Sequence, residues 1–157
     1  MTITEQDLSD ARIAWGEGMI AISRAYESGG IELARKASET VLDNLYGYDL
    51  GPVLFKPTLA SGAQTFRPTR AGALSYFVGH DPEYPLDSGF GIKGWCKVET
   101  QTSAFFTEGA IAMWMGWVSL TDNDGNIVTV DKSFGYKRDD AGVLKIIQHH
   151  SSLPYQP

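Results

Sequence analysis

The sequence predicts a single α+β domain in which helices from the N-terminal part pack on a curved antiparallel sheet formed by the C-terminal half. Over residues 4–45, apolar side chains recur at spacings of three and four, which is typical of helices. From about residue 91, four long strand-forming runs follow one another through short turns, which favours an antiparallel meander. Helices that precede such a sheet cover one of its faces. The length of 157 residues fits one domain, 1–157, with one core.

The helical part divides at a pair of glycines. Thr4 can cap the first helix, and the run Ser28-Gly29-Gly30 should end it, because glycine tolerates the backbone conformation of a helix C-terminus. A second helix is expected over residues 31–45. Further along the chain, Thr69 opens a short helix with the sequence ALSYF, which Gly79 closes.

The strands are expected in two groups. A short strand over residues 53–59 contains Pro57, which cannot donate to a ladder, so this strand either lies at a sheet edge or is bulged at Pro57. The four long strands are expected at residues 91–100 (or as far as 106), 110–121, 127–136 and 143–151. The second of these is apolar at most positions, which predicts a central strand buried on both faces. A sheet curved around a helix forms a cone, whose mouth can hold a pocket.

Composition and charge argue against several classes of function. The 13 Lys and Arg residues against 19 Asp and Glu give a net charge of −6, and no basic run offsets it, so nucleic acid is not an expected partner. No apolar run is long enough for a membrane helix, and the N-terminus lacks a signal core, so a cytoplasmic location is expected. The single cysteine, Cys96, excludes an internal disulfide, and its strand pattern predicts that it is buried.

The last strand, VLKIIQHHSSLPY, ends in two histidines and two serines. Strict alternation puts an imidazole and a hydroxyl side by side on each face, His149 with Ser151 and His150 with Ser152. The first pair would share its face with Val143, Lys145 and Ile147, and the second pair with Leu144, Ile146 and Gln148. Either face could point into the domain, and a polar strand end that simply reaches solvent fits the pattern equally well.

The same pattern argues against a protein-bound metal. A catalytic zinc needs three protein ligands, but His149 and His150 point to opposite faces of the strand, and the remaining histidine, His80, lies in an expected loop. The sequence contains neither a G-x-S-x-G turn nor a glycine-rich phosphate loop. We therefore expect no metal and no cofactor.

Three segments of the chain together resemble the iota-class carbonic anhydrases: LYGYDLGPVLFKPTLA, FRPTRAGALSYFVG and the closing HHSSLPY. These enzymes belong to the NTF2-like superfamily, near its association-domain-like branch, and the resemblance is to the bacterial and algal members that work without a metal. It covers roughly residues 45–155. It implies an NTF2-like cone, a homodimer with one pocket per subunit, and the reversible hydration of carbon dioxide to bicarbonate and a proton.

The resemblance also implies which residues form the site. Hydroxyl groups would hold the anion, and the matching positions are Thr58 in FKPT, Tyr76 in ALSY and Ser151 in HHSS. Such O–H donors can meet the negative charge that grows on the oxygens during hydration. His149, beside Ser151, is the expected proton acceptor or relay, because a neutral imidazole can take a proton near pH 7 and pass it on. Three apolar side chains are expected to form the wall against carbon dioxide: Phe55, Phe77 and Trp114.

Two other functions remain open from the sequence. Another small-molecule enzyme on the same cone, an isomerase or dehydratase, would need a buried base, for which Asp131 is the candidate. The domain could also be a noncatalytic module for ligand binding or oligomerisation. Each expected site residue has a structural explanation as well, since Thr58 could complete an irregular edge and His149 could be a hydrogen-bonded core histidine.

Overall fold

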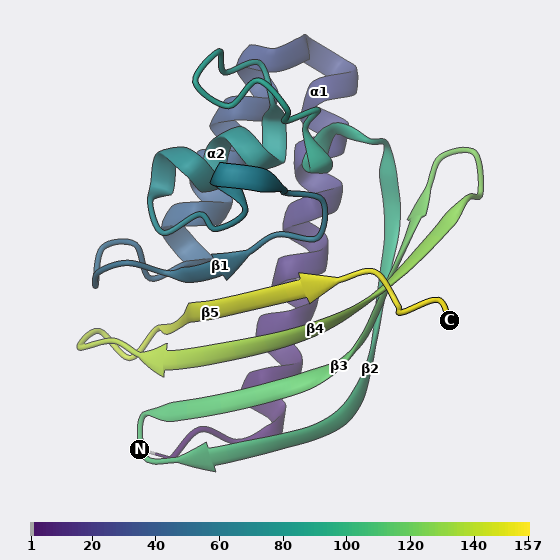
Figure 1. Cartoon of the computed structure of the whole chain (residues 1–157). Coiled ribbons are helices and arrows are strands. Elements are labelled where there is room, and N and C mark those ends of the chain that lie inside the picture. The colour runs from purple at the N-terminus through teal and green to yellow at the C-terminus, as the bar shows by residue number, and fades with distance from the viewer. Residues whose placement is uncertain (1) are drawn as a thin grey trace.

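The computed structural model describes residues 2–157 and contains a long helix, a shorter one and a curved five-stranded sheet (Figure 1). The elements follow in the order α1 (Glu5–Leu45), β1 (Leu54–Lys56), the 3₁₀ turn η1 (Gly62–Gln64), α2 (Arg70–Val78), the 3₁₀ turn η2 (Phe90–Ile92), β2 (Trp95–Glu108), β3 (Ile111–Asp122), β4 (Ile127–Arg138) and β5 (Leu144–Ser152). The expected α+β class, with helices before the sheet, is confirmed.

Helix α1 begins and bends where the sequence predicts. Thr4 caps it: its Oγ1 accepts from the Asp7 amide at 3.1 Å, and the Asp7 carboxylate accepts from the Thr4 amide at 2.8 Å. Gly30 has φ +72°, a value that favours glycine, and it separates the two expected helical halves by a kink. Over residues 2–157 no helix is both long and apolar enough to cross a membrane, although α1 has 41 residues.

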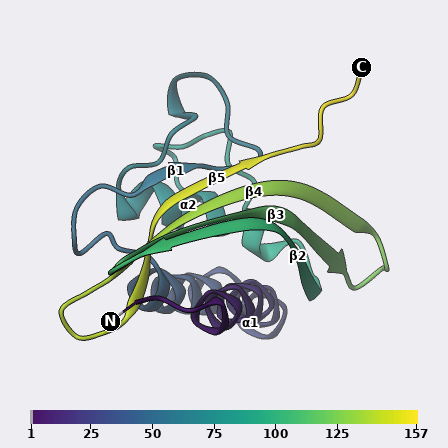
Figure 2. The same ribbon diagram turned by 90° about the horizontal axis from the view of Figure 1, so that it is seen from below.

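The sheet has the strand order β1-β5-β4-β3-β2. Strands β2 to β5 form the predicted antiparallel meander, and the sheet curves over α1 (Figure 2). Strand β1 pairs in parallel with β5 at the sheet edge, which is one of the two arrangements expected from Pro57. This pairing brings the segment after β1 beside the end of β5, although the two are about ninety residues apart in the sequence.

A bulge in β5 changes which of its side chains point inward. His149 lies opposite Phe134 of β4, but Ile146 lies opposite Tyr136, so that Ile147 is an extra residue on β5. Ile146 and His149 are therefore both buried in the domain. The expected alternation holds from His149 onward and is wrong before the bulge, where Ile147 does not share the face of His149.

Two expectations about burial are wrong for the single chain. Strand β3 lies between β2 and β4, but only one of its faces is buried, while Met113, Met115 and Trp117 on the other are 54%, 51% and 43% exposed. Cys96 is exposed because β2 is an edge strand with an open outer face, and Trp95 points inward in its place. Apolar character alone does not distinguish a buried strand face from one left open.

Candidate active site

The end of β5 points its first histidine–serine pair into the domain. His149 and Ser151 are both buried, whereas His150 is exposed on the opposite face. The site therefore lies on the inner face of the sheet, where β1, β5 and β4 run side by side and α1 and α2 cover them (Figure 1). This arrangement shows which face of β5 points into the domain, which the alternating pattern of the sequence does not decide.

The three expected hydroxyl groups lie together. The Oγ1 atom of Thr58, just after β1, is 2.5 Å from the Oγ atom of Ser151 on β5. The Tyr76 hydroxyl, on α2, accepts from the backbone N–H of Leu59 at 3.2 Å. Burial raises the pKa of Tyr76 to about 12, even though hydrogen bonds from Leu59 and with Thr58 oppose the rise. Near pH 7, Tyr76 is thus a neutral phenol that can donate its proton in a hydrogen bond.

A small cavity of about 20 Å³, enough for about one water molecule, borders the Tyr76 end of this group. Tyr76 and Leu59 line one part of it, and Lys93 and Asp87 lie on its wall. The Asp87 carboxylate is held by the Arg67 guanidinium at 2.7 Å and by the Ser75 hydroxyl at 2.7 Å, which anchors the loop before η2 against α2. Tyr76 is the member of the hydroxyl cluster that lines this cavity.

His149 is enclosed, and both of its ring nitrogens have partners. Nδ1 is 2.8 Å from the Tyr46 hydroxyl, and Nε2 is 2.9 Å from the Nζ atom of Lys132. The Phe55 ring stacks on the imidazole with centroids 4.5 Å apart. Burial, reinforced by the positive charge that Lys132 carries whenever it is protonated, holds the pKa of His149 well below its ordinary value. His149 is therefore neutral near pH 7, and neither nitrogen is free to meet a substrate.

Lys132 is a part of the site that the sequence did not identify. Its Nζ atom lies 3.0 Å from Ser151 Oγ as well as 2.9 Å from His149 Nε2, and it sits 4.8 Å from the centre of the Trp15 ring. Lys132 is only 3% exposed, and among residues 2–157 no carboxylate forms an ion pair with it. Burial lowers its pKa to about 7, with the Lys56 charge adding to the effect and Asp131 opposing it.

A signal for Lys132 was present in the sequence. Val130, Lys132 and Phe134 alternate along an expected strand, so that Lys132 shares the face of two apolar residues. Its pairing opposite Ser151, by contrast, depends on the register between β4 and β5. Tyr46 and Trp15 were missed too. Trp15 Nε1 donates to the Tyr46 hydroxyl at 2.9 Å, directly behind His149.

Two of the three expected wall residues lie beside the cluster. The Phe55 ring is between Tyr76 and His149, with centroid distances of 5.9 and 4.5 Å, and Phe77 packs 5.9 Å from Phe55. Trp114 lies elsewhere. It pairs across strands with Phe134, which itself pairs with His149, so Phe134 separates Trp114 from the hydroxyl groups.

The structure gives no support to a buried carboxylate base or a metal cluster. Asp131 precedes Lys132 on β4, so its side chain lies on the opposite face, where it is only partly buried. Within the described part of the chain, no three His, Cys, Asp or Glu residues are grouped closely enough to hold a metal ion. A dehydratase or isomerase site built on Asp131 therefore does not fit this geometry.

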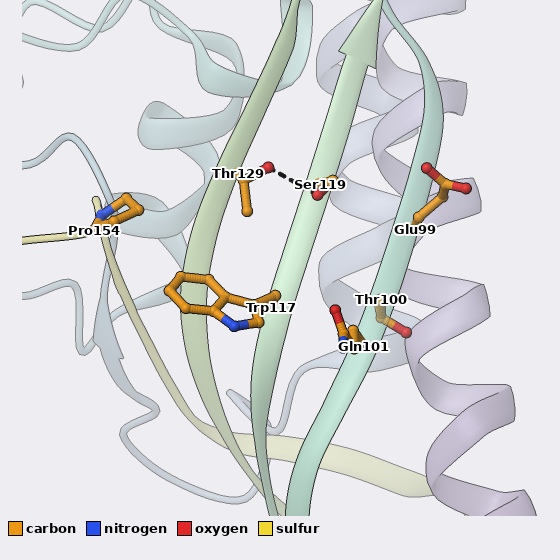
Figure 3. Close-up of a pocket in the computed structure, with 7 residues that line it drawn as sticks. All are labelled: Glu99, Thr100, Gln101, Trp117, Ser119, Thr129 and Pro154. Carbon is orange, nitrogen blue, oxygen red and sulfur yellow. Dashed lines mark hydrogen bonds between the residues drawn. The ribbon is translucent and has the colours of Figure 1, made fainter.

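A larger hollow lies on the outer face of the sheet (Figure 3). It is lined by Glu99, Thr100, Gln101, Trp117, Ser119, Thr129 and Pro154. Glu99 is the one ionisable side chain in its lining. The hydroxyl oxygens of Ser119 and Thr129 are 2.9 Å apart and share a hydrogen bond. It contains none of the hydroxyl, imidazole or amine groups of the inner cluster, and we do not assign the chemistry to it.

A long N-terminal helix packed on a curved five-stranded sheet is the NTF2-like fold. Solved structures support this class. A protein of the NTF2-like family from Streptomyces avermitilis superimposes with a TM-score of 0.59 at 16% identity, covering 96% of each chain. An association domain of the calcium/calmodulin-dependent protein kinase II type from Xanthomonas campestris gives a TM-score of 0.56 at 21% identity, covering 99% of this chain and 91% of the other. At such identities these matches show the fold alone.

Closer relatives identify the family. The family model for metal-independent carbonic anhydrase matches residues 6–153. A metal-independent carbonic anhydrase from Nostoc sp. is 51% identical over 154 residues, which cover 98% of this chain and 75% of the relative. The crystal structure of a cyanobacterial iota-carbonic anhydrase complexed with bicarbonate has a TM-score of 0.98 at 51% identity, covering 99% of this chain and 95% of the other. The chain belongs to the family of metal-independent carbonic anhydrases, and the resemblance found in its sequence is confirmed.

Proposed function

We propose that this chain carries out the carbonic anhydrase reaction, CO₂ + H₂O to bicarbonate and a proton, at the cluster formed by Thr58, Tyr76 and Ser151. The observation that carries this proposal is the convergence of three hydroxyl side chains from β5, α2 and the segment after β1, with Thr58 and Ser151 2.5 Å apart. Membership of the carbonic anhydrase family supports the same reaction.

The hydroxyl groups suit an anion with three oxygens in one plane. An anion that enters between Thr58 and Ser151 would replace their mutual hydrogen bond by bonds to its own oxygens. Tyr76 adds a neutral O–H donor from a different direction. A donor aimed at developing charge in a site shielded from water is worth about 3 kcal/mol, or roughly a hundred- to thousandfold in rate.

Carbon dioxide is apolar, and we propose that the Phe55 and Phe77 rings form its wall. Phe55 packs against both the Tyr76 ring and the His149 ring, so it borders the hydroxyl cluster directly. The Phe77 ring extends this surface, because it stacks on Phe55 with centroids 5.9 Å apart and packs 5.7 Å from the Tyr76 ring. The reacting carbon would then lie between an apolar surface and a row of hydrogen-bond donors, which favours uptake of the neutral gas and stabilisation of the charged product.

Stopped-flow hydration of carbon dioxide with a pH indicator, in the presence of a strong chelator, tests this function. We expect turnover to survive chelation. The variants Thr58→Ala, Tyr76→Phe and Ser151→Ala should each lower turnover at least about tenfold while the circular dichroism spectrum is unchanged. Wild-type rates in all three variants would reject this site. Turnover that chelation abolishes and one cation restores would reject the metal-free mechanism, and no turnover in either condition would favour a binding module.

We also propose that the chain forms a homodimer through the outer face of the sheet. Phe106, Met113, Met115 and Trp117 lie on this face of β2 and β3, where Met113 pairs directly with Phe106. A contiguous apolar surface of this kind is typical of a protein interface, and a two-fold dimer would cover it with its own copy. Sedimentation of the purified chain tests the proposal, and a monomer at all concentrations would reject it.

The cytoplasmic location expected from the sequence stays a prediction. Fractionation of cells that produce the full-length natural protein, followed by detection in the cytosolic and exported fractions, would test it.

A further inference from the structure

The three hydroxyl groups alone do not explain why the amine of Lys132 is buried beside them. We propose that Lys132 is the residue that accepts the proton released during hydration, through the Ser151 hydroxyl, and that His149 positions Lys132 instead of taking the proton itself. This inference rests on the proposed function. Its support is the pattern of donors and acceptors around His149, together with the direct contact between Lys132 and Ser151.

The hydrogen bonds around Tyr46 determine which nitrogen of His149 carries the proton. An indole nitrogen can only donate, so the Tyr46 oxygen accepts from Trp15. The Tyr46 proton then needs an acceptor of its own, and among the described residues the acceptor within reach is His149 Nδ1 at 2.8 Å. Because a neutral imidazole has one donor and one acceptor, the ring proton lies on Nε2.

This assignment makes Lys132 a neutral amine. The N–H of His149 Nε2 points at the Lys132 Nζ atom, 2.9 Å away. An ammonium has three donors and no acceptor, so it could not receive this hydrogen bond, whereas a neutral amine can. The opposite arrangement, with Lys132 charged and the ring proton on Nδ1, would leave the buried Tyr46 hydroxyl proton without an acceptor, which native structures avoid.

A short path joins the amine to the reacting atoms. Lys132 Nζ is 3.0 Å from Ser151 Oγ, which is 2.5 Å from Thr58 Oγ1. As the oxygen of water forms its bond to the carbon of carbon dioxide, one water O–H bond breaks and its proton passes to Ser151 Oγ. The proton of Ser151 passes to Lys132, whose lone pair turns from His149 to Ser151 by rotation about the Cε–Nζ bond. Bicarbonate and an ammonium result, and Ser151 is regenerated.

The charges balance at each stage of this step. Before it, neutral carbon dioxide and water meet a neutral amine, and after it, a bicarbonate anion lies close to the Lys132 cation, where opposite charges stabilise each other. The Trp15 ring, 4.8 Å from Nζ, can stabilise the new cation by its π face. When bicarbonate leaves, the cation loses its partner and returns the proton through Ser151 to solvent or buffer.

The charged and titratable groups around Lys132 set the pH at which it works. Lys56 on β1 donates to the backbone carbonyl of Ser151 at 2.7 Å, and Asp131 and His150 lie on the outer face of β4 and β5. Tyr46 and Tyr76, at the end of α1 and on α2, stay neutral because burial raises the pKa of both. With burial as the main cause, the pKa of Lys132 is about 7, so a large part of the amine is neutral and ready to accept a proton near pH 7.

The test compares pH–rate profiles of hydration for the wild type and three variants of the full chain. In the wild type, we expect the rate to rise with pH through a midpoint near 7. Lys132→Met should lower the rate at least about tenfold and remove this rise. His149→Gln should move the midpoint but keep the rise. Lys145→Met is the matched control: it also removes a buried amine from this region, one that donates to the Asp43 carbonyl away from the cluster, and should keep the midpoint.

A Lys132→Met variant whose profile keeps the wild-type midpoint, whatever its absolute rate, would overturn the proposal. A His149→Gln variant that loses the rise while Lys132→Met keeps it would also overturn it. Should Lys132→Met not fold, NMR of the wild type labelled with ¹³C at lysine Cε decides the question, because one resonance should titrate near pH 7, far from ordinary lysines at about 10.4. Titration of every lysine above pH 9 would overturn it. A wild type without turnover would reject the proposed function, whereas an active wild type insensitive to Lys132 would reject only this inference.

Discussion

The inner and outer faces of the same sheet reverse the usual distribution of polar and apolar side chains. On the inner face, Lys132, His149 and Ser151 are buried, and each has hydrogen-bond partners. On the outer face of the neighbouring strand, Met115 and Trp117 are about half-exposed. Burying polar groups is costly even when they are paired, and exposed apolar surface is costly in water. The comparison indicates that the inner face is built for chemistry and the outer face for a partner.

The largest effect on stability is expected when a side chain on the inner face of β1 is removed, compared with its neighbour on the outer face. Phe55 is fully buried against His149 and Phe77, whereas Leu54 is 65% exposed. Phe55→Ala should lower the free energy of unfolding by about 4 kcal/mol, because it removes a ring from a packed core. Leu54→Ala should change it by less than about 0.5 kcal/mol. Urea denaturation of both variants tests this, and equal losses would contradict the assignment of faces.

A second pair of neighbours tests the chemistry of the inner face. Ser151 contacts Thr58 and Lys132, whereas Ser152 lies on the other face of β5. Ser151→Ala should lower the hydration rate about a hundredfold, equivalent to about 3 kcal/mol. Ser152→Ala should leave it within about twofold, since surface changes are usually small. Equal rates for the two variants in stopped-flow assays would place the chemistry elsewhere.

The contribution of Lys132 to stability should depend on pH. Its pKa is about 7 in the folded chain against 10.5 ordinarily, so between these values the unfolded chain binds a proton that the folded chain lacks. The free energy of unfolding then rises with pH over this window. The difference between wild type and Lys132→Met should rise by roughly 3 kcal/mol from pH 7 to pH 10. Denaturant unfolding at several pH values measures it, and a flat difference would show that the buried amine titrates normally.

The outer face should tolerate charge without loss of the fold. In the double variant Met115→Lys and Trp117→Lys, the sedimentation coefficient should fall to that of a monomer. The free energy of unfolding measured at low protein concentration should change by no more than about 1 kcal/mol, because both side chains are already half-exposed in one chain. A dimer that survives both changes would show that another surface makes the interface.

The fold could be predicted from the sequence because its signals are local. The helix ends and the kink of α1 are determined by the side chain or backbone conformation of single residues. In the structure these residues are the N-caps Thr4 and Thr69, the C-cap Gly79, and Gly30 at the kink. The bulge at Ile147 could not be predicted, because it depends on how β5 aligns with Gly135 on another strand.

The site was only partly accessible to sequence reasoning. The positions of Thr58, Tyr76 and Ser151 came from a resemblance, since nothing in their spacing indicates that they meet. Lys132 was missed because a lysine in a strand is usually on the solvent face, and only the register with Ser151 brings its amine into the cluster. Trp114 was expected at the site for its size and strand, but Phe134 stands between it and the hydroxyl groups.

The central claim is that three hydroxyl groups hold the product anion on the inner face. A crystal structure of this chain with bicarbonate would test it most directly. We expect the anion oxygens within about 2.6–3.0 Å of the hydroxyl oxygens of Thr58, Tyr76 and Ser151. An anion bound only in the outer hollow beside Trp117, or one held by a metal ion on the inner face, would contradict it.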